Sequence, residues 1–131
     1  MEIKLTNTES ENIFHTALCN SLDYFHGYGI ELDFIKKDYE LASSKLKAER
    51  PDTGVCYEDV LMQILRDGKE LTFIDNECDG EYTRSISLKD VHERVCKTPL
   101  SYLTDMIEEN DDATTGDVVL QTVLYEEIIF G

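Results

Sequence analysis

Apolar residues in the first part of the chain recur with the period of an α-helix. From Phe14 to Phe25 they follow one another at steps of three and four residues, which places them on one helical face. Residues 8–11, with the sequence TESE, have the spacing of a capping box, in which a threonine and a glutamate satisfy free backbone amides. Gly27 is a residue type that commonly follows a helix end. The pattern predicts a first helix from about residue 8 to residue 27.

The helical period continues in two shorter segments. One begins after Asp33 or Phe34 and ends before Pro51, because proline disfavours helical geometry in the residue that precedes it. The other has its apolar side in the segment 60–65 and is closed by Gly68. These segments predict a second and a third helix.

In the two runs that flank Asp79 and Gly80, apolar and polar residues alternate as they do in β-strands. An Asp-Gly pair between alternating runs is typical of a type I′ turn, which needs a positive φ at both central residues. The pattern therefore predicts a β-hairpin with strands at about 70–77 and 81–87.

Two further helices are predicted after the hairpin. Ser87 is followed three residues later by Asp90, an arrangement that resembles a capping box and predicts a short helix. Pro99 predicts the start of the next helix, because its missing N–H has no helical partner to lose at the first position.

The last amphipathic run covers residues 119–128. Thr114 or Thr115 could cap a helix there, and the β-branched content leaves a terminal strand at 128–130 as an alternative. All these elements together predict an α+β fold, in which five or six short helices pack on one β-hairpin and residues 1–131 form a single compact domain.

Composition makes charge the outstanding property of this chain. A length of 131 residues suits one domain with one core, and a hydrophobic content of 41% argues against disorder. The 28 acidic and 12 basic residues give a formal net charge of −16. This charge repels nucleic acid and anionic membranes, so we expect direct binding to neither. The expected partner is a basic protein surface.

The beginning of the chain and its cysteines bear on the compartment. The first residues lack the apolar stretch of a signal peptide, and no apolar run approaches the roughly 20 residues that span a bilayer. Cys19, Cys56, Cys78 and Cys96 are irregularly spaced, which favours reduced thiols over a disulfide framework. We therefore expect a cytoplasmic protein.

Negative charge is concentrated toward the carboxyl end, since no lysine or arginine follows Lys97. The expected partner-binding residues are Asp105, Glu108, Glu109, Asp111, Asp112 and Asp117. In charge, size and lack of motifs, the chain is similar to nucleic-acid-mimicking inhibitors that phages and mobile elements encode. This similarity implies an inhibitor of a nucleic-acid-binding enzyme. The alternative is that the stretch 108–117 is only a solvated connection whose acids cap helices.

The acidic stretch around the predicted turn does not complete a calcium loop. Asp75, Glu77 and Asp79 occupy the first, third and fifth positions of an EF-hand loop, and Gly80 occupies the sixth. The twelfth position, where a bidentate glutamate is needed, is Ile86. No calcium site is predicted.

Two histidine–cysteine pairs raise the question of zinc. His15 and Cys19, like His92 and Cys96, are four residues apart and would lie one turn apart on a helical face. Two such pairs could form a tetrahedral site. Neither pair has the short spacing of known structural zinc sites, so no metal and no other cofactor is predicted. A small metal-binding protein or enzyme that uses these pairs is the alternative.

No catalytic site is predicted. Cys56 or Cys78 could act as a nucleophile with His26 as its base. No neighbouring residue in the sequence activates either thiol. A third alternative is a structural homodimer that associates through the apolar segment 118–130. The sequence favours a non-enzymatic acidic binding module or inhibitor.

Overall fold

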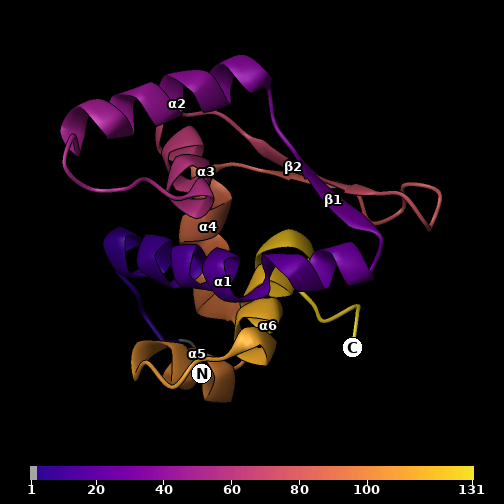
Figure 1. Cartoon of the computed structure of the whole chain (residues 1–131). Helices are drawn as coiled ribbons and strands as arrows, with labels where there is room; N and C mark the ends of the chain where they lie inside the picture. Colours follow the sequence, from indigo (N-terminus) through magenta and orange to yellow (C-terminus); the bar gives the residue numbers. More distant parts are fainter. Residues whose placement is uncertain (1–2) are drawn as a thin grey trace.

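The computed structural model describes residues 3–131 (Figure 1). In that part of the chain, six α-helices and one short 3-10 helix pack around a small antiparallel sheet, which confirms the predicted α+β fold. The elements are α1 Asn7–Gly27, β1 Ile30–Asp33, α2 Lys36–Glu49, α3 Tyr57–Arg66, β2 Leu71–Asp75, β3 Arg84–Ile86, α4 Leu88–Arg94, η1 Val95–Lys97, α5 Leu100–Ile107 and α6 Ala113–Tyr125.

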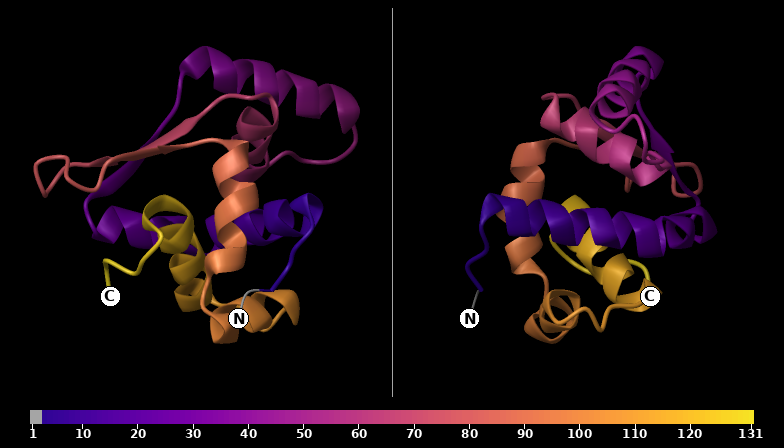
Figure 2. Two further views of the ribbon diagram at one scale, coloured as in Figure 1. Left: turned by 180° about the vertical axis from the view of Figure 1, so that it is seen from behind. Right: turned by 60° about the vertical axis from the view of Figure 1, so that its left-hand side comes forward.

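The long helix α1 crosses the middle of the molecule. The sheet, α2 and α3 lie on one side of α1, and α5 and α6 lie on the other, as both Figure 1 and the right-hand view of Figure 2 show. The view from behind in Figure 2 shows α4 running from the sheet down to α5. The most extensive contact between two elements joins α1 to α6, so the two ends of the chain close the fold together.

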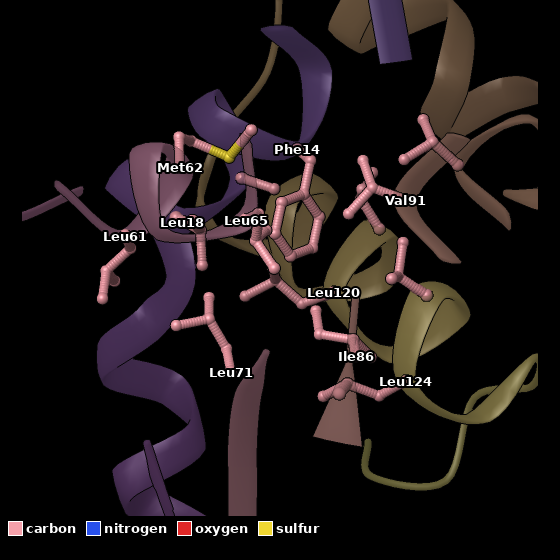
Figure 3. Packing of buried hydrophobic residues seen from close by; sticks show 14 of the residues in the cluster. Phe14, Leu18, Leu61, Met62, Leu65, Leu71, Ile86, Val91, Leu120 and Leu124 are labelled. Carbon is pink, nitrogen blue, oxygen red and sulfur yellow. The ribbon is translucent and has the colours of Figure 1, made fainter. Parts of the chain in front are cut away.

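Side chains from all these elements meet in one apolar core (Figure 3). The core includes Phe14 and Leu18 of α1, Leu61 and Leu65 of α3 and Leu120 of α6, and each of the five is at most 1% exposed. The apolar stripe predicted on the first helix is therefore the element around which the core is built.

The sheet contains one strand that the sequence pattern did not predict. β1 pairs antiparallel with β2, with Leu32 opposite Phe73, and β2 pairs with β3, with Leu71 opposite Ile86. The predicted hairpin is confirmed. The segment 128–130, which we considered as a terminal strand, belongs to no regular element.

The two hairpin strands are shorter than predicted because Asp75 holds the connection between them. Its buried carboxylate accepts hydrogen bonds from the N–H groups of Glu77, Cys78 and Tyr82 at 2.9 to 3.1 Å. These bonds, the one from Cys78 first, lower the pKa of Asp75 below its usual range. These N–H groups donate to a side chain and are therefore not available to pair the two strands over a longer length.

The tip of this connection is the predicted turn. Asp79 and Gly80 have φ values of 54° and 81°, and the N–H of Glu81 donates to the carbonyl of Cys78 at 3.0 Å. Two consecutive positive φ values are the mark of a type I′ turn. The tip extends away from the helices (Figure 1).

The capping box of α1 lies two residues before the predicted stretch 8–11. The Thr6 hydroxyl accepts from the Glu9 N–H at 3.1 Å, and the Glu9 carboxylate accepts from the Thr6 N–H at 2.9 Å. The helix therefore begins at Asn7. The sequence holds two threonine–glutamate pairs at the required spacing, and the earlier one is used.

The starts of the last two helices also differ from the predictions. Pro99 is the N-cap of α5 and not its first helical residue. Asp112, and neither Thr114 nor Thr115, caps α6, because its carboxylate accepts from the Thr115 N–H at 2.9 Å. A carboxylate is at least as good a cap as a threonine hydroxyl and also interacts favourably with the helix dipole.

Candidate functional site

A hollow of about 430 Å³ lies between the first half of α1 and the connection from α5 to α6. Its lining includes three carboxylates and three apolar side chains, which are Glu9, Glu109, Asp111, Ile13, Met106 and Ile107. None of the residues that line it is basic. The hollow therefore combines negative charge with an apolar wall, and Ile107 leaves about half of its surface, 47%, exposed.

The end of α5 positions one side of this hollow. The N–H of Asn110 donates to the carbonyl of Asp105 at 2.8 Å, and the N–H of Glu109 donates to that of Met106 at 3.4 Å. These two bonds form a Schellman motif, in which the residue at the Glu109 position takes the left-handed conformation. Glu109 does so with a φ of 60°, although glycine is the usual residue there.

Five of the six predicted partner-binding acids gather at this end of the molecule. Glu108, Glu109 and Asp112 are exposed, whereas Asp105 and Asp111 are half-buried. Within the described residues, none of the five takes part in an ion pair. Their charge is thus left uncompensated by neighbouring bases.

Seven of the twelve lysines and arginines form ion pairs among the described residues, and each pairs with an acid outside this group. Arg66 pairs with Glu11 at 2.7 Å, and Lys45 pairs with Asp67 at 2.9 Å. Glu11 belongs to α1 and Lys45 to α2, Arg66 is the last residue of α3, and Asp67 follows it directly. The acids at the α5–α6 end thus differ from Glu11 and Asp67, which are paired with bases.

Asp117 does not belong to this surface, contrary to our expectation. It is 6% exposed, and its Oδ2 accepts from the Tyr28 hydroxyl at 2.9 Å and from Gln121 Nε2 at 2.8 Å. Its Oδ1 has no hydrogen-bond partner within residues 3–131. Burial raises the pKa of Asp117, and the two hydrogen bonds offset only part of this effect. Because α6 is enclosed nearly all round, Asp117 faces the interior and cannot contact a partner.

This environment leads to a pH-dependent prediction. Since the pKa of Asp117 is raised in the folded state, its charge destabilises the fold increasingly as pH rises through the unfolded-state pKa toward the higher folded-state value. We expect Asp117→Asn to remove this effect. The stability of the variant relative to the parent should rise from acidic to neutral pH and then level off, as measured by urea unfolding at a series of pH values.

Asp112→Asn is the matched control on the same helix. Hydrogen bonds from Thr115 lower the pKa of Asp112, so its charge stabilises the fold above the unfolded-state pKa and this contribution is lost as pH falls. The stability of this variant relative to the parent should therefore fall from acidic to neutral pH. A difference that is independent of pH for Asp117→Asn would contradict the prediction.

The predicted pairs His15/Cys19 and His92/Cys96 do not meet in one metal site. Each histidine contacts a carboxylate on another helix, and His15 Nε2 lies 2.8 Å from Oδ1 of Asp59. Among the described residues, these two cysteines and two histidines therefore do not form one metal site.

His92, Glu11 and Arg66 form a cluster of polar and charged side chains. The Nε2 of His92 lies 2.8 Å from Glu11 Oε2, and Arg66 Nε donates to the other oxygen of Glu11 at 2.7 Å. Burial raises the pKa of Glu11, but the hydrogen bonds and the charge interactions with Arg66 and His92 together lower it below its usual range. This cluster joins α1, α3 and α4.

The apolar segment 118–130 is not available for self-association over most of its length. From Val118 to Leu124 no residue is more than 6% exposed, because α6 packs on α1 within the same chain. The feature that suggested a homodimer is the interior of the domain.

Sequence reasoning identified the acids at the α5–α6 end but missed Glu9 and the apolar wall. Glu9 and Ile13 are four residues apart on α1, so a shared helical face could have been predicted. The approach of α1 to a segment about a hundred residues later has no signal in a single sequence.

Comparisons with protein-family models, with curated proteins and with solved structures found no match for this chain. Among the described residues, no helix is both long and apolar enough to cross a membrane.

Proposed function

We propose that this chain is a non-enzymatic, cytoplasmic binding module that holds a basic segment of a partner protein in the acidic hollow. The observation that carries the proposal is a set of three carboxylates around an apolar wall, none of which forms an ion pair with another described residue. An apolar side chain of the partner would contact the exposed Ile107, while its lysines and arginines would face Glu109 and Asp111. The partner class is a protein whose basic surface normally binds nucleic acid, and occupation of that surface would inhibit it.

The conformation of Glu109 supports this assignment. A residue with a side chain in the left-handed conformation costs roughly 1–2 kcal/mol, and glycine avoids most of this cost. Backbone strain of this kind tends to be retained where a side chain has a function. A charge at the rim of the hollow gives Glu109 such a function.

The compartment assigned in the proposal is consistent with the cysteines. Cys19, Cys56 and Cys78 are exposed free thiols, and Cys96 is a half-buried one. Free thiols persist in a reducing compartment, in which disulfides are rare.

We expect binding of a basic amphipathic peptide to depend on both salt and these carboxylates. The probe is a synthetic helical peptide with lysines on one face and leucines on the other, and its affinity is measured by calorimetry. The electrostatic screening length falls from about 30 Å at 0.01 M salt to about 8 Å at 0.15 M, so affinity should fall over this range. The double variant Glu109→Gln, Asp111→Asn should bind about tenfold more weakly at low salt, which corresponds to about 1.4 kcal/mol.

Two comparisons make this test specific. The control Glu31→Gln, Glu70→Gln removes the same charge from exposed positions on and beside the sheet, and should leave affinity nearly unchanged. Glu109→Gly should make the fold more stable and yet weaken binding, because strain and charge disappear together. Equal losses in the two double variants would refute the proposed hollow and leave only a general effect of net charge.

A further inference from the structure

We propose that His15, Cys56 and Asp59 form a zinc site, separate from the acidic hollow. One ligand atom of each residue lies within 4.8 Å of those of the other two, and no other group of three such residues is this close in the part of the chain that the structure describes. Imidazole nitrogen, thiolate sulfur and carboxylate oxygen are the ligands that zinc takes in proteins.

The three ligands come from two helices with fixed geometry. His15 lies in the middle of α1, which is ordered along its length by the core. Cys56 is the N-cap of α3, and Asp59 is the third residue of that helix. A reciprocal capping arrangement between Cys56 and Asp59 holds both at the helix start. The ligands are therefore placed by the backbone and not by flexible loops.

The carboxylate of Asp59 is already oriented for this role. Its Oδ2 accepts from Arg50 Nη1 at 3.2 Å and from the Cys56 N–H at 3.3 Å. Its Oδ1 is left facing His15 Nε2 at 2.8 Å. Ligating carboxylates are commonly held by such hydrogen bonds to the second oxygen, which fix the direction of the first.

Zinc would enter between His15 and Asp59. In a tetrahedral site with bonds of about 2.0 Å, the nitrogen and oxygen ligands lie about 3.3 Å apart. The distance between His15 Nε2 and Asp59 Oδ1, now 2.8 Å, would therefore increase by about half an ångström. Arg50 and Cys56 are exposed and can adjust. A polar hollow of about 180 Å³, lined in part by His15, Arg50 and Asp59, adjoins the cluster and has room for a water molecule as fourth ligand.

Zinc titration of the purified chain against a chromophoric chelator tests the proposal. We expect one equivalent of zinc to bind, and we expect Cys56→Ser and His15→Gln each to weaken binding roughly 100-fold or more. Serine is a good N-cap, so Cys56→Ser keeps the start of α3, and far-ultraviolet circular dichroism checks the fold. Cobalt in place of zinc should give a thiolate charge-transfer band that Cys56→Ser removes.

Cys78→Ser is the matched control. Cys78 is an exposed thiol near Glu77 and Asp79 at the hairpin tip, and should not affect binding. Absence of zinc binding would overturn the proposal. So would binding that survives both Cys56→Ser and His15→Gln, or binding that Cys78→Ser abolishes. None of these results bears on the peptide affinity of the acidic hollow, so the two proposals fail independently.

Discussion

Gly116→Ala should destabilise the domain by about 2 kcal/mol, although alanine is the better residue for a helix interior. A Cβ at Gly116 would overlap the hydroxyl of Ser21 and lie 3.3 Å from Cα of Ala17, both on α1. Ser21 is fully buried and its Oγ donates to the carbonyl of Ala113 at 2.6 Å, so the hydroxyl cannot turn away without losing this bond. Overpacking of this kind costs about 1–3 kcal/mol and a lost hydrogen bond about 1 kcal/mol, against about 1 kcal/mol gained in helix propensity.

Valine at the same position should have a larger effect. Its two further methyl groups have no space between helices that pack this closely, and the loss is expected to reach about 4 kcal/mol, a large part of the stability of a small domain. Urea unfolding followed by circular dichroism measures both variants.

Gly27→Ala is the matched control, since a Cβ at Gly27 would meet no atom within 4 Å. It should leave stability unchanged or raise it slightly. Replacing Ser21 with glycine in the Gly116→Ala background should restore part of the loss, because the two substitutions exchange volume at one contact. If Gly116→Ala is as stable as the parent, α1 and α6 do not approach each other as closely as described.

The second large effect is expected for Gln121→Ala. Gln121 is completely buried, and its amide joins α6 to the end of the chain. Its Oε1 accepts from the N–H groups of Ile129 and Phe130, each at 2.8 Å, and its Nε2 donates to the carbonyl of Phe130 at 3.0 Å and to Asp117 at 2.8 Å. Alanine leaves all these groups without their partner. The expected loss is about 2–4 kcal/mol, limited by the freedom of the terminal residues to turn to water.

Release of the terminal residues would also break an aromatic contact. The rings of Phe130 and Tyr28 stack with centroids 4.5 Å apart and an interplanar angle of 9°. In Gln121→Ala the N–H groups of Ile129 and Phe130 should therefore exchange with solvent hydrogen much faster than in the parent, as measured by nuclear magnetic resonance.

Gln63→Ala makes the same chemical change at a site where one hydrogen bond, to Asp67, is lost. It should cost less than about 1 kcal/mol. The double variant Gln121→Ala, Phe130→Ala should lose less stability than the sum of the two single variants, because both substitutions remove contacts that hold residues 129 and 130 against the rest of the fold. Equal effects of Gln121→Ala and Gln63→Ala, with the terminal amides still protected, would show that the buried amide does not hold the terminus.

Much of the secondary structure follows from local patterns in the sequence. The apolar stripe of α1 and the Asp79-Gly80 turn were predicted because each depends only on residues close together in the chain. β1 was missed although Ile30–Asp33 alternates, since four residues carry little periodicity. Its existence depends on pairing with β2, forty residues later.

The candidate sites depend even more on distant contacts. The burial of Asp117 could not be predicted, because an amphipathic pattern predicts one exposed face, whereas α6 is enclosed nearly all round. The cluster of His15, Cys56 and Asp59 combines residues from two helices, and the sequence offered only the local partner Cys19 for this histidine. Charge along the chain predicted the acidic end, but not that Glu9 completes it.

The packing of α1 on α6 has a consequence for synthesis of the chain on the ribosome. Ser21 bonds to Ala113, which is made 92 residues later, so α1 emerges long before the helix that covers it exists. Until then its apolar stripe stays open to chaperones and to other nascent chains. The final closure of the fold should therefore wait until α6 has left the ribosome, and premature termination before residue 113 should yield an aggregating fragment.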